Sequence, residues 1–589
     1  IEKDDIFKQS QKIINLSKNN GFIYETDGLI FTPINKSVGS SKLGILEKNR
    51  TWRQSFKWKP PEFNTIDFLV RTVKDDNKKE IVNYMYENGT NVQSNSNIVK
   101  YKTLKLHVGF SKNDGFLNPC ETVLSGNIEE AIKWYNAEDS SYRPAPFMPT
   151  NPTPKHKIYL CNIKLINNLM MTEDKTQSFE DNTIVEFRYE KTNLANWEWV
   201  PIRVRYDKTA DYKKTNRNFG NSYGVACSVW RSINFPITEK MISGLDKIPD
   251  FVDDNEIYYK KRNTDENITK SLRDFHNKYV KSLLIRTTSM PDNILIDMSV
   301  GRGGDIYKWI ESRLKFVLGI DYSKDNINNK GDGICSRYIK AKMNYPKVFD
   351  GIFLHGSATK NIANGESFSS PKDIEIMKSV LGTGSKNEEL GKMVHKYYGV
   401  GKDGFDIVSN MFSIHYFFGN AVDIHNFIRN VSENCKIGGY FIGTCYDGEK
   451  IFKMLEDIDP NNGISQITNG KYDNEIKVWE VIKKYDKKEF LANESCLGYQ
   501  IDVYQESINK LIPEYLVHFK YFEKLMNLYG FTLLTSDELK KFNLKGSVGS
   551  FETLFKNMKA ENKKFHKKYG TAFSMKDYEK KISFLNNYF

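Results

Sequence analysis

The sequence predicts a multidomain protein in which a β-rich N-terminal part precedes an α/β domain built on a buried, mostly parallel sheet. Three observations support this prediction. A chain of 589 residues is too long for one hydrophobic core. Short strand-like runs separated by turn residues fill much of residues 1–209. From about residue 266, continuous apolar runs alternate with amphipathic helical segments, as in a parallel sheet covered by helices on both faces.

The composition is that of a globular protein with a basic balance. Hydrophobic residues make up 39% and charged residues 27%, and no apolar run reaches the roughly 18 residues that a membrane span requires. The formal net charge of +12 favours a polyanionic partner. The seven cysteines are scattered without a C-x-x-C pair, so neither a disulfide framework nor a zinc site is predicted. Because the first residue is Ile1 and not Met, we expect a fragment or a processed product.

The N-terminal part divides into three predicted regions. Residues 1–66 have the pattern of the end of a β-rich domain, in which Pro60 and Pro61 must leave any helix or strand ladder. Residues 67–209 contain five strand-like runs spaced like a small OB-like barrel: IDFLVRTV, YKTLKLHVGF, HKIYLCNIKLI, TIVEFRYE and WVPIRVRYD. Residues 210–265 are polar and rich in Asn and Lys, and we expect a connector that contains short helices.

A glycine-rich turn opens the C-terminal α/β region. In LIDMSVGRGGDIYKW, Gly301, Gly303 and Gly304 fall between a predicted strand and a predicted helix, where glycines let the backbone approach a ligand closely. Asp321 ends the next strand, in FVLGID, where an acidic side chain can meet ribose hydroxyls. No G-K-[ST] follows the glycines, which disfavours a phosphate cradle. A tight turn without a ligand remains the alternative for such a pattern.

The C-terminal region resembles the mRNA cap guanine-N7 methyltransferases. LIDMSVGRGGDIYKW, GIDYSKDNINN, FDIVSNMFSIHYFF and GGYFIGT occur in the order found in that family, and FHNKYVKSLLI resembles its opening helix. The resemblance implies that residues 266–589 form a Rossmann-like class I methyltransferase that uses S-adenosylmethionine and acts on the GpppN cap at the 5′ end of mRNA. It implies a cofactor pocket lined by Lys281, Asp297, Gly301, Gly303, Asp305 and Asp321.

The same resemblance implies a cap-binding group. His276 and Asn277 are expected near the RNA, and Asn277 and Lys281 have the i,i+4 spacing that puts both on one helix face. In IPEYLVHF, Glu514 corresponds to the carboxylate that recognises guanine, and Tyr515 follows it.

Methyl transfer to guanine N7 needs alignment more than a catalytic base. N7 carries a lone pair and no proton, so the residues that position the two substrates are the important ones. Glu514 can accept hydrogen bonds from guanine, His415 can donate to its O6, and Phe412 or Tyr416 can stack on a base that becomes cationic. For His415 and its neighbours, the alternative is that they only cap a core strand.

The sequence departs from the family at two positions. Met411 stands where the family usually has Gln, and Met offers only backbone or sulfur contacts to a cofactor. Gly356-Ser357-Ala358 follows the strand FDGIFLH where the family commonly has an Asp near the adenine amine, so Ser357 or a backbone carbonyl is the expected substitute. The chain ends in ISFLNNYF, which resembles the start of the family's final strand and makes Tyr588 an expected aromatic cap contact.

Three N-terminal motifs resemble the nucleotidyltransferase superfamily of capping enzymes and ligases: DGLIFTP, SFKWKPPEF and WVPIRVRYDK. The two-residue alternation of a strand puts Lys57 and Lys59 on one face, and likewise Arg203 and Arg205. The resemblance implies that these residues, with Asp207 and Lys208, bind the phosphates of GTP, and that Asp27 lies near Mg²⁺ or Mn²⁺.

The superfamily also requires a nucleophilic lysine in a K-x-D-G motif ahead of DGLIFTP. The match at Lys112–Gly115 follows that motif instead, so we interpret it as a barrel turn. We therefore expect this chain alone to form no lysine–GMP adduct, and guanylyltransferase activity to belong to a longer protein.

The order of a nucleotidyltransferase part, an OB-like barrel and an N7 methyltransferase in one chain resembles the large multifunctional mRNA capping enzymes of nucleocytoplasmic DNA viruses, such as asfarviruses, mimiviruses and poxviruses. This resemblance implies a cytoplasmic location, in a viral factory or virion, and a stimulatory subunit or the viral RNA polymerase as partner. An alternative from another class is a catalytically silent RNA- and cap-binding subunit of a capping complex.

Overall fold

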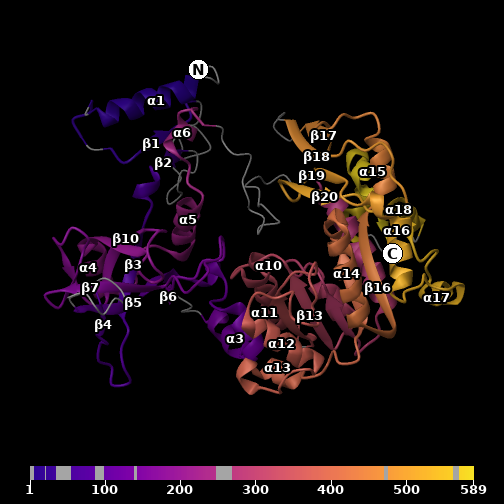
Figure 1. Ribbon diagram of the computed structural model, residues 1–589, viewed down its shortest axis with the longest axis horizontal. Helices are drawn as coiled ribbons and strands as arrows, with labels where there is room; N and C mark the ends of the chain where they lie inside the picture. Colours follow the sequence, from indigo (N-terminus) through magenta and orange to yellow (C-terminus); the bar gives the residue numbers. More distant parts are fainter. Residues whose placement is uncertain are drawn as a thin grey trace. The chain divides into compact units, whose positions relative to one another are not determined.

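The computed structural model describes residues 5–19, 21–24, 26–34, 55–86, 98–137, 142–246, 268–345, 347–469, 475–560 and 569–589 (Figure 1). They belong to two compact units, which are described separately. The first comprises Ile1–Asp114 and Glu138–Asp254, and the second comprises Gly115–Ala137 and Asn255–Phe589. The predicted barrel region 67–209 therefore contains a segment, residues 115–137, that packs with the C-terminal unit.

The first unit is dominated by an antiparallel sheet. Its strands run in the order β11-β10-β3-β5-β7-β8-β9, and β4 and β6 also pair with β5. The N–H of Glu173 donates to the carbonyl of Pro201, and the N–H of Val204 donates to the side chain of Gln177. These bonds link the two ends of the sheet, so that it nearly closes on itself. The strands are β3 (Thr65–Thr72), β4 (Asn83–Tyr86), β5 (Ile98–Phe110), β6 (Arg143–Pro146), β7 (Leu160–Ile166), β8 (Leu169–Met171), β9 (Ser178–Phe179), β10 (Thr183–Tyr189) and β11 (Trp199–Val204).

A smaller set of elements precedes and follows this sheet. Helix α1 (Asp5–Lys18) comes before a short antiparallel pair formed by β1 (Leu29–Phe31) and β2 (Phe56–Trp58). After the sheet come helices α4 (Tyr206–Thr215), α5 (Tyr223–Asn234) and α6 (Glu239–Ile242), and α5 and α6 are short helices of the predicted connector. Lys112–Asp114 forms a 3₁₀ turn directly after β5, which confirms the interpretation of the K-x-D-G match as a turn.

The second unit contains the predicted α/β sheet. Its strands run in the order β14-β13-β12-β15-β16-β22-β21. The first five are parallel to one another, and β22 is antiparallel to both β16 and β21. The strand order reverses between β12 and β15, which is where open α/β sheets bind ligands, outside the carboxyl ends of the strands. The strands are β12 (Ile294–Asp297), β13 (Phe316–Asp321), β14 (Asp350–His355), β15 (Phe405–Met411), β16 (Cys435–Tyr446), β21 (Gly549–Ser550) and β22 (Asn586–Tyr588).

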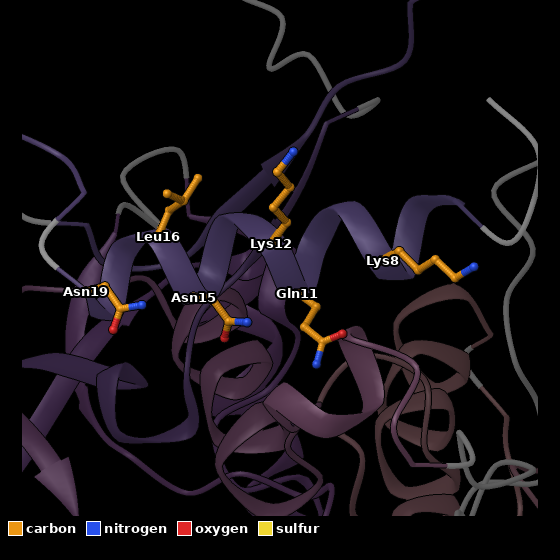
Figure 2. Close-up of a pocket in the computed structure, with 6 residues that line it drawn as sticks. All are labelled: Lys8, Gln11, Lys12, Asn15, Leu16 and Asn19. Atoms are coloured by element: carbon orange, nitrogen blue, oxygen red, sulfur yellow. The ribbon is translucent and has the colours of Figure 1, made fainter.

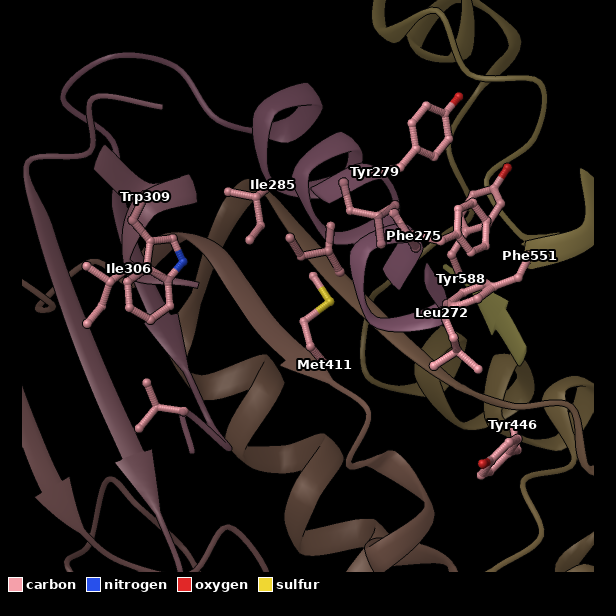
Figure 3. Close-up of a cluster of buried hydrophobic side chains, with 14 of the residues drawn as sticks. Leu272, Phe275, Tyr279, Ile285, Ile306, Trp309, Met411, Tyr446, Phe551 and Tyr588 are labelled. Atoms are coloured by element: carbon pink, nitrogen blue, oxygen red, sulfur yellow. The ribbon is translucent and has the colours of Figure 1, made fainter. Parts of the chain in front are cut away.

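Both faces of this sheet are buried. Successive residues of a strand point to opposite faces of the sheet, so two hydrophobic clusters that alternate along the strands must lie on opposite faces. Leu295, Val317 and Ile407 belong to one hydrophobic cluster, and the next residue of each strand, Ile296, Leu318 and Val408, belongs to another. Figure 3 shows part of the first cluster, where side chains from the sheet meet those of the helices beside it. The continuous apolar runs of the sequence are thus explained, and the Rossmann-like prediction for this region is confirmed.

Helices surround the sheet, and a second, antiparallel sheet extends it. The second sheet has the order β17-β18-β19-β20. Its strands are β17 (Gly463–Asn469), β18 (Glu475–Lys483), β19 (Gln500–Gln505) and β20 (Lys510–Tyr515). The helices are α2 (Pro119–Ser125), α3 (Ile128–Asn136), α7 (Lys270–Asp274), α8 (Lys281–Thr288), α9 (Ile306–Glu311), α10 (Lys324–Asn328), α11 (Ile334–Asn344), α12 (Pro371–Leu381), α13 (Lys392–Lys396), α14 (Ala421–Asn434), α15 (Gly448–Met454), α16 (Phe519–Leu528), α17 (Ser536–Phe542), α18 (Phe551–Ala560) and α20 (Asp577–Ser583).

Within these described ranges, no helix combines the length and apolar character that crossing a membrane would require.

Candidate active site

The glycine turn between β12 and α9 lies at the carboxyl edge of the parallel sheet. Gly301 and Gly303 have φ of +54° and +72°, a backbone conformation that favours glycine. A Cβ atom added to Gly301 would meet nothing within 4 Å, so the turn faces open space at this point. Its backbone N–H donates to Asp321 Oδ2 at 2.7 Å. The turn and the end of β13 are therefore held together by the acidic residue that the sequence singled out.

Asp321 is buried, with three donors around its carboxylate. Besides Gly301, the N–H of Ser323 and the side-chain amide of Asn326 donate to Oδ1, at 2.9 and 3.0 Å. Burial raises the pKa of Asp321 above its usual value, although these hydrogen bonds act in the opposite direction. Tyr322 follows with an exposed ring, and Tyr322 is a candidate ligand contact that the sequence reading missed. In the sequence, Tyr322 could have been found as the aromatic residue that directly follows Asp321 at the end of the strand.

A charged network links the turn to α8. Asp305 is held by two lysines: Lys281 Nζ lies 3.2 Å from Oδ2 and Lys308 Nζ lies 2.8 Å from Oδ1. Burial would raise the pKa of Asp305, but the two ammonium groups bring it to about 2. Asp297 differs, because burial and the negative charge of Asp305 raise its pKa to about 7. One carboxylate is thus firmly ionised, and the other can change its charge near neutral pH. Lys308 was not predicted, although the spacing of DIYK puts it one turn from Asp305.

A π-helix changes which residues meet beside this network. Residues Phe275–Val280 form a π-helix, and its i→i+5 hydrogen bonds bring His276 and Lys281 closer to one side than an α-helix would. The His276 ring stacks on Phe412 at 5.2 Å between centroids, and Lys281 Nζ lies 5.5 Å from the centre of that same ring. Asn277 instead donates to the carbonyl of Arg273. The i,i+4 argument for Asn277 and Lys281 assumed an ordinary α-helix, and in this π-helix their common face stays a prediction.

Phe412 marks the end of β15 with a strained backbone. Its φ is +59°, which is uncommon for an aromatic residue and is stabilised by hydrogen bonds from its N–H to the carbonyl and hydroxyl oxygens of Thr444. The preceding Met411 is buried in the first hydrophobic cluster (Figure 3), with its sulfur 4.0 Å from the Thr444 hydroxyl. The Met411 side chain packs in the core, and the predicted cofactor contact at this residue stays a prediction.

His415 and Glu514 form a buried polar pair at the same edge of the sheet. His415 lies in the 3₁₀ helix Ile414–Gly419 after β15, and Glu514 lies on β20. His415 Nε2 and Glu514 Oε1 are 3.6 Å apart. Across the described ranges, no partner hydrogen-bonds to either ring nitrogen of His415 or to Glu514 Oε2. Burial lowers the pKa of His415 to about 3 and raises that of Glu514 to about 8. Both groups are thus mainly neutral at pH 7, with hydrogen-bonding capacity unused.

Aromatic rings enclose this pair. The Tyr416 ring lies 4.3 Å from that of His415 between centroids, in an edge-on arrangement. Tyr446, which the sequence reading missed, is buried 6.5 Å from the His415 ring. Gln505 donates its amide N–H to the Tyr446 hydroxyl, and burial together with the charge of Glu514 raises the pKa of Tyr446 well above its usual value. These rings leave the two unpartnered groups in a largely apolar surrounding.

Two further predicted site residues, Tyr588 and Ser357, make hydrogen bonds within the protein. Tyr588 on β22 is buried in the first hydrophobic cluster (Figure 3), and its hydroxyl donates to the carbonyl of Gly546. Tyr588 therefore packs in the core, and its role as an aromatic cap contact stays a prediction. Ser357 lies just after β14, and its hydroxyl shares a 2.7 Å hydrogen bond with that of Thr359. Ser357 remains at the edge of the sheet that carries Asp321.

In the first unit, the predicted phosphate-binding residues are paired with acids. Lys59 lies 2.6 Å from Asp27, and the charge of Lys57 also helps to lower the pKa of Asp27, so both lysines do lie near that carboxylate. Arg203 bonds to Glu186. Arg205 also pairs with its near neighbour Asp207, which is largely exposed, at 3.5 Å.

The predicted phosphate-binding residues that follow β11 are paired with an acid in the same way. Arg205 and Lys208 both bond to the buried Asp67, each at 2.6 Å. Among the residues that the structure describes, no cluster of three or more His, Cys, Asp or Glu side chains could hold a metal ion. The metal near Asp27 therefore stays a prediction.

A pocket on α1 does not match any of these groups. Figure 2 shows its lining, which comes from one face of that single helix. The residues are Lys8, Gln11, Lys12, Asn15, Leu16 and Asn19. Because their spacing is that of one helix face and most of them are exposed, the feature is a groove between neighbouring side chains.

Viral proteins named as mRNA-capping enzymes are similar to this chain over most of its length. A protein of Acanthamoeba polyphaga mimivirus named as a probable mRNA-capping enzyme is 26% identical over 596 residues, covering 97% of this chain and 44% of its own length. An mRNA-capping enzyme of African swine fever virus is 22% identical over 533 residues, covering 88% of this chain and 50% of its own. The chain thus spans about half the length of these relatives.

A cellular relative matches slightly less than half of the chain. The mRNA cap guanine-N(7) methyltransferase of Aspergillus niger is 28% identical over 291 residues, covering 46% of this chain and 43% of its own length. The family model of the mRNA (guanine-N(7))-methyltransferase domain matches residues 250–585, which is more than half of the chain. That range contains the glycine turn, the charged network and the His415–Glu514 pair. The chain therefore belongs to the mRNA (guanine-N(7))-methyltransferase domain family.

Proposed function

We propose that the second unit transfers a methyl group from S-adenosylmethionine to N7 of the guanine in a GpppN mRNA cap. The observation that carries this proposal is the buried pair of His415 and Glu514, with unsatisfied hydrogen-bonding atoms, at the same sheet edge as the glycine turn. Buried polar atoms in native proteins are nearly always paired, so an unpaired set indicates a missing polar ligand. The family to which the chain belongs supports the choice of that ligand.

The residues of the turn fit the cofactor. Gly301 faces open space where a side chain would otherwise stand, and Asp321 is fixed beside it to accept hydrogen bonds from ribose hydroxyls. We assign Lys281 to the carboxylate of the cofactor and Asp297 to its amino group. The pKa of Asp297 near 7 would fall when a cation binds beside it, because an opposite charge favours the ionised carboxylate. When bound, S-adenosylmethionine supplies a methyl group already activated on a sulfonium.

The residues of the second group fit guanine. Ionised Glu514 accepts hydrogen bonds from the N1–H and the exocyclic amine, and neutral His415 donates to O6. A neutral imidazole suits this position, because a cation there would oppose the positive charge that develops on the purine. Tyr416 and Tyr446 exclude water around the base. Catalysis in this scheme consists of alignment, and no side chain needs to remove a proton.

We further propose that the first unit is part of a guanylyltransferase with an OB-like barrel. The nearly closed antiparallel sheet supports the barrel, and the printed names of the viral relatives support the activity for the longer protein. In this proposal Lys57, Lys59, Arg203, Arg205 and Lys208 exchange their acidic partners for GTP phosphates, while Asp27 and Asp207 are released, Asp27 towards Mg²⁺ or Mn²⁺.

Methyl transfer tests the main proposal directly. The full chain is incubated with labelled S-adenosylmethionine and GpppA-capped RNA, and the RNA is digested to nucleotides. We expect the label in 7-methylguanosine of the cap. Label on a ribose 2′-oxygen would contradict the assignment of Glu514 to guanine, and cap binding without any transfer would favour a silent cap-binding subunit.

A further inference from the structure

The segment of residues 115–137 is built into the hydrophobic interior of the second unit, although it lies far from that unit in sequence. Phe116, Val123 and Ile128 belong to the first hydrophobic cluster and Leu124 to the second. The Phe116 ring also stacks on Tyr135 within the segment. The family model begins only at residue 250, so this segment is a part of the methyltransferase unit that lies outside the matched domain.

The segment contacts the loop that follows Asp321. The N–H of Phe116 donates to the carbonyl of Lys330 at 2.8 Å, and the ammonium group of Lys330 donates to the carbonyl of Leu117. Gly115 has φ of +104°, and a Cβ atom there would lie 1.8 Å from the Lys330 carbonyl oxygen. Only glycine permits this close approach of the two backbones.

The opposite side of the same loop holds the candidate cofactor site. Ser323 and Asn326 donate to the carboxylate of Asp321, as described above. Arg302, next to Gly301 in the glycine turn, bonds to Asp325 at 2.5 Å and to Asp332 at 2.7 Å. Residues 323–332 therefore contact the 115–137 segment on one side, and on the other side Asp321 and the glycine turn, which we assign to the cofactor. The position of this loop fixes both of them.

A disulfide between Cys120 and Cys335 connects the segment to the end of this loop. Cys120 lies on α2 and Cys335 in the first turn of α11, and they are separated by 215 residues in sequence. Cys335 is buried, whereas Cys120 is partly exposed, so we expect a small thiol to attack the bond from the Cys120 side. The cysteine pattern did not predict this bond, because pairing across such a distance depends on the fold.

We propose that thiol–disulfide exchange at Cys120–Cys335 controls the affinity of the second unit for S-adenosylmethionine, by fastening the 115–137 segment against the loop of residues 323–332. Two glutathione molecules reduce the bond to two thiols and leave as glutathione disulfide, and the reverse reaction restores it. After reduction, the Cys120 thiol has the carbonyl of Ile327 3.3 Å away as an acceptor. The segment therefore stays docked, and the effect is a graded loss of affinity. This inference rests on the proposed function, because it concerns the same cofactor.

The test compares the full chain in two redox states. It is equilibrated with reduced glutathione or with glutathione disulfide, free thiols are alkylated, and the dissociation constant for S-adenosylmethionine is measured by calorimetry. We expect a Cys120–Cys335 cross-linked peptide after oxidation and affinity about three- to tenfold higher in that state, which corresponds to a 0.7–1.4 kcal/mol difference. The Michaelis constant for capped RNA should stay unchanged, which a general loss of folding would not allow.

Matched variants distinguish an effect of the Cys120–Cys335 bond from effects of oxidation at other cysteines. Cys120→Ser should bind the cofactor with the affinity of the reduced protein in both states, whereas Cys227→Ser, in the first unit, should respond as the unaltered chain does. Equal affinities in the two redox states, or oxidation without the cross-linked peptide, would overturn the inference alone. Failure to bind S-adenosylmethionine in either state would instead overturn the proposed function.

Discussion

Replacing Glu514 with glutamine is expected to lower kcat/KM for cap methylation by at least about 100-fold, roughly 2.7 kcal/mol of lost stabilisation. The amide has nearly the same size, but its NH₂ group can be turned towards the N–H donors of guanine, and a buried donor without an acceptor is costly. The measurement is the steady-state rate with GpppA-capped RNA. Glu475→Gln, an exposed acid on the same sheet, is the matched control and should leave the rate unchanged.

The role of Glu514 also predicts the direction in which kcat/KM for the cap changes with pH. Because Glu514 must be ionised to accept both hydrogen bonds and its pKa is about 8 in the free protein, kcat/KM for the cap should rise from pH 6 towards pH 8. In the variant this rise should be absent. A wild-type profile that falls over this range would contradict the role of the carboxylate.

The same replacement should stabilise the fold at alkaline pH. The folded-state pKa of Glu514 lies above the ordinary value of 4.5, so between pH 4.5 and about 8 the folded protein holds a proton that the unfolded chain releases. The free energy of unfolding therefore falls as pH rises through this window, and glutamine removes that loss. We expect the melting temperature of Glu514→Gln to exceed that of the wild type at pH 8 and to match it at pH 4.5. Equal melting temperatures at both pH values would show that Glu514 is not buried as described.

Replacing Gly301 with alanine is expected to weaken binding of S-adenosylmethionine by at least about tenfold, or 1.4 kcal/mol. The new methyl group meets no protein atom within 4 Å, so the loss of affinity comes from a clash with the cofactor and not with the fold. The left-handed backbone also costs roughly 1 kcal/mol of stability for any residue with a Cβ.

Gly438→Ala is the matched control for that backbone cost. Gly438 has φ of +79° and also meets nothing within 4 Å, but it lies near the amino end of β16, away from the carboxyl edge of the sheet. Calorimetry should therefore show similar losses of thermal stability for the two variants and a loss of cofactor affinity for Gly301→Ala alone. Equal affinities in both would remove the glycine turn from the cofactor site.

The sheet of the second unit could be predicted because its signal is local. Runs such as FVLGID are apolar throughout, and only a strand buried on both faces needs that pattern. Gly301 and Asp321 could be singled out for the same reason, since strand ends and the turns after them lie together at one edge of a parallel sheet, whereas Asp305 came from the family resemblance. The identity of the cap-binding residues came from resemblance, and not from composition or spacing.

Other features depend on contacts between distant parts of the chain. FHNKYV contains no glycine or proline, so nothing local in it indicates the π-helix that brings His276 and Lys281 together. Met411 and Tyr588 are residue types that suit either a pocket or a core, and their burial in the first hydrophobic cluster could be seen only from the packing of β15 and β22. The packing of the 115–137 segment with the second unit was missed because the sequence places it inside the predicted barrel region, and the Cys120–Cys335 bond was missed because only the fold brings these two cysteines together.

The most direct test of the central claim is a crystal structure of the full chain with S-adenosylhomocysteine and GpppA. The account predicts that the sulfur and guanine N7 lie at the carboxyl edge of β12 and β15, with room for one methyl group about 3 to 3.5 Å from N7. It also predicts that Glu514 contacts the guanine edge. A cap guanine bound elsewhere, or a sulfur too far from N7 for direct transfer, would contradict it.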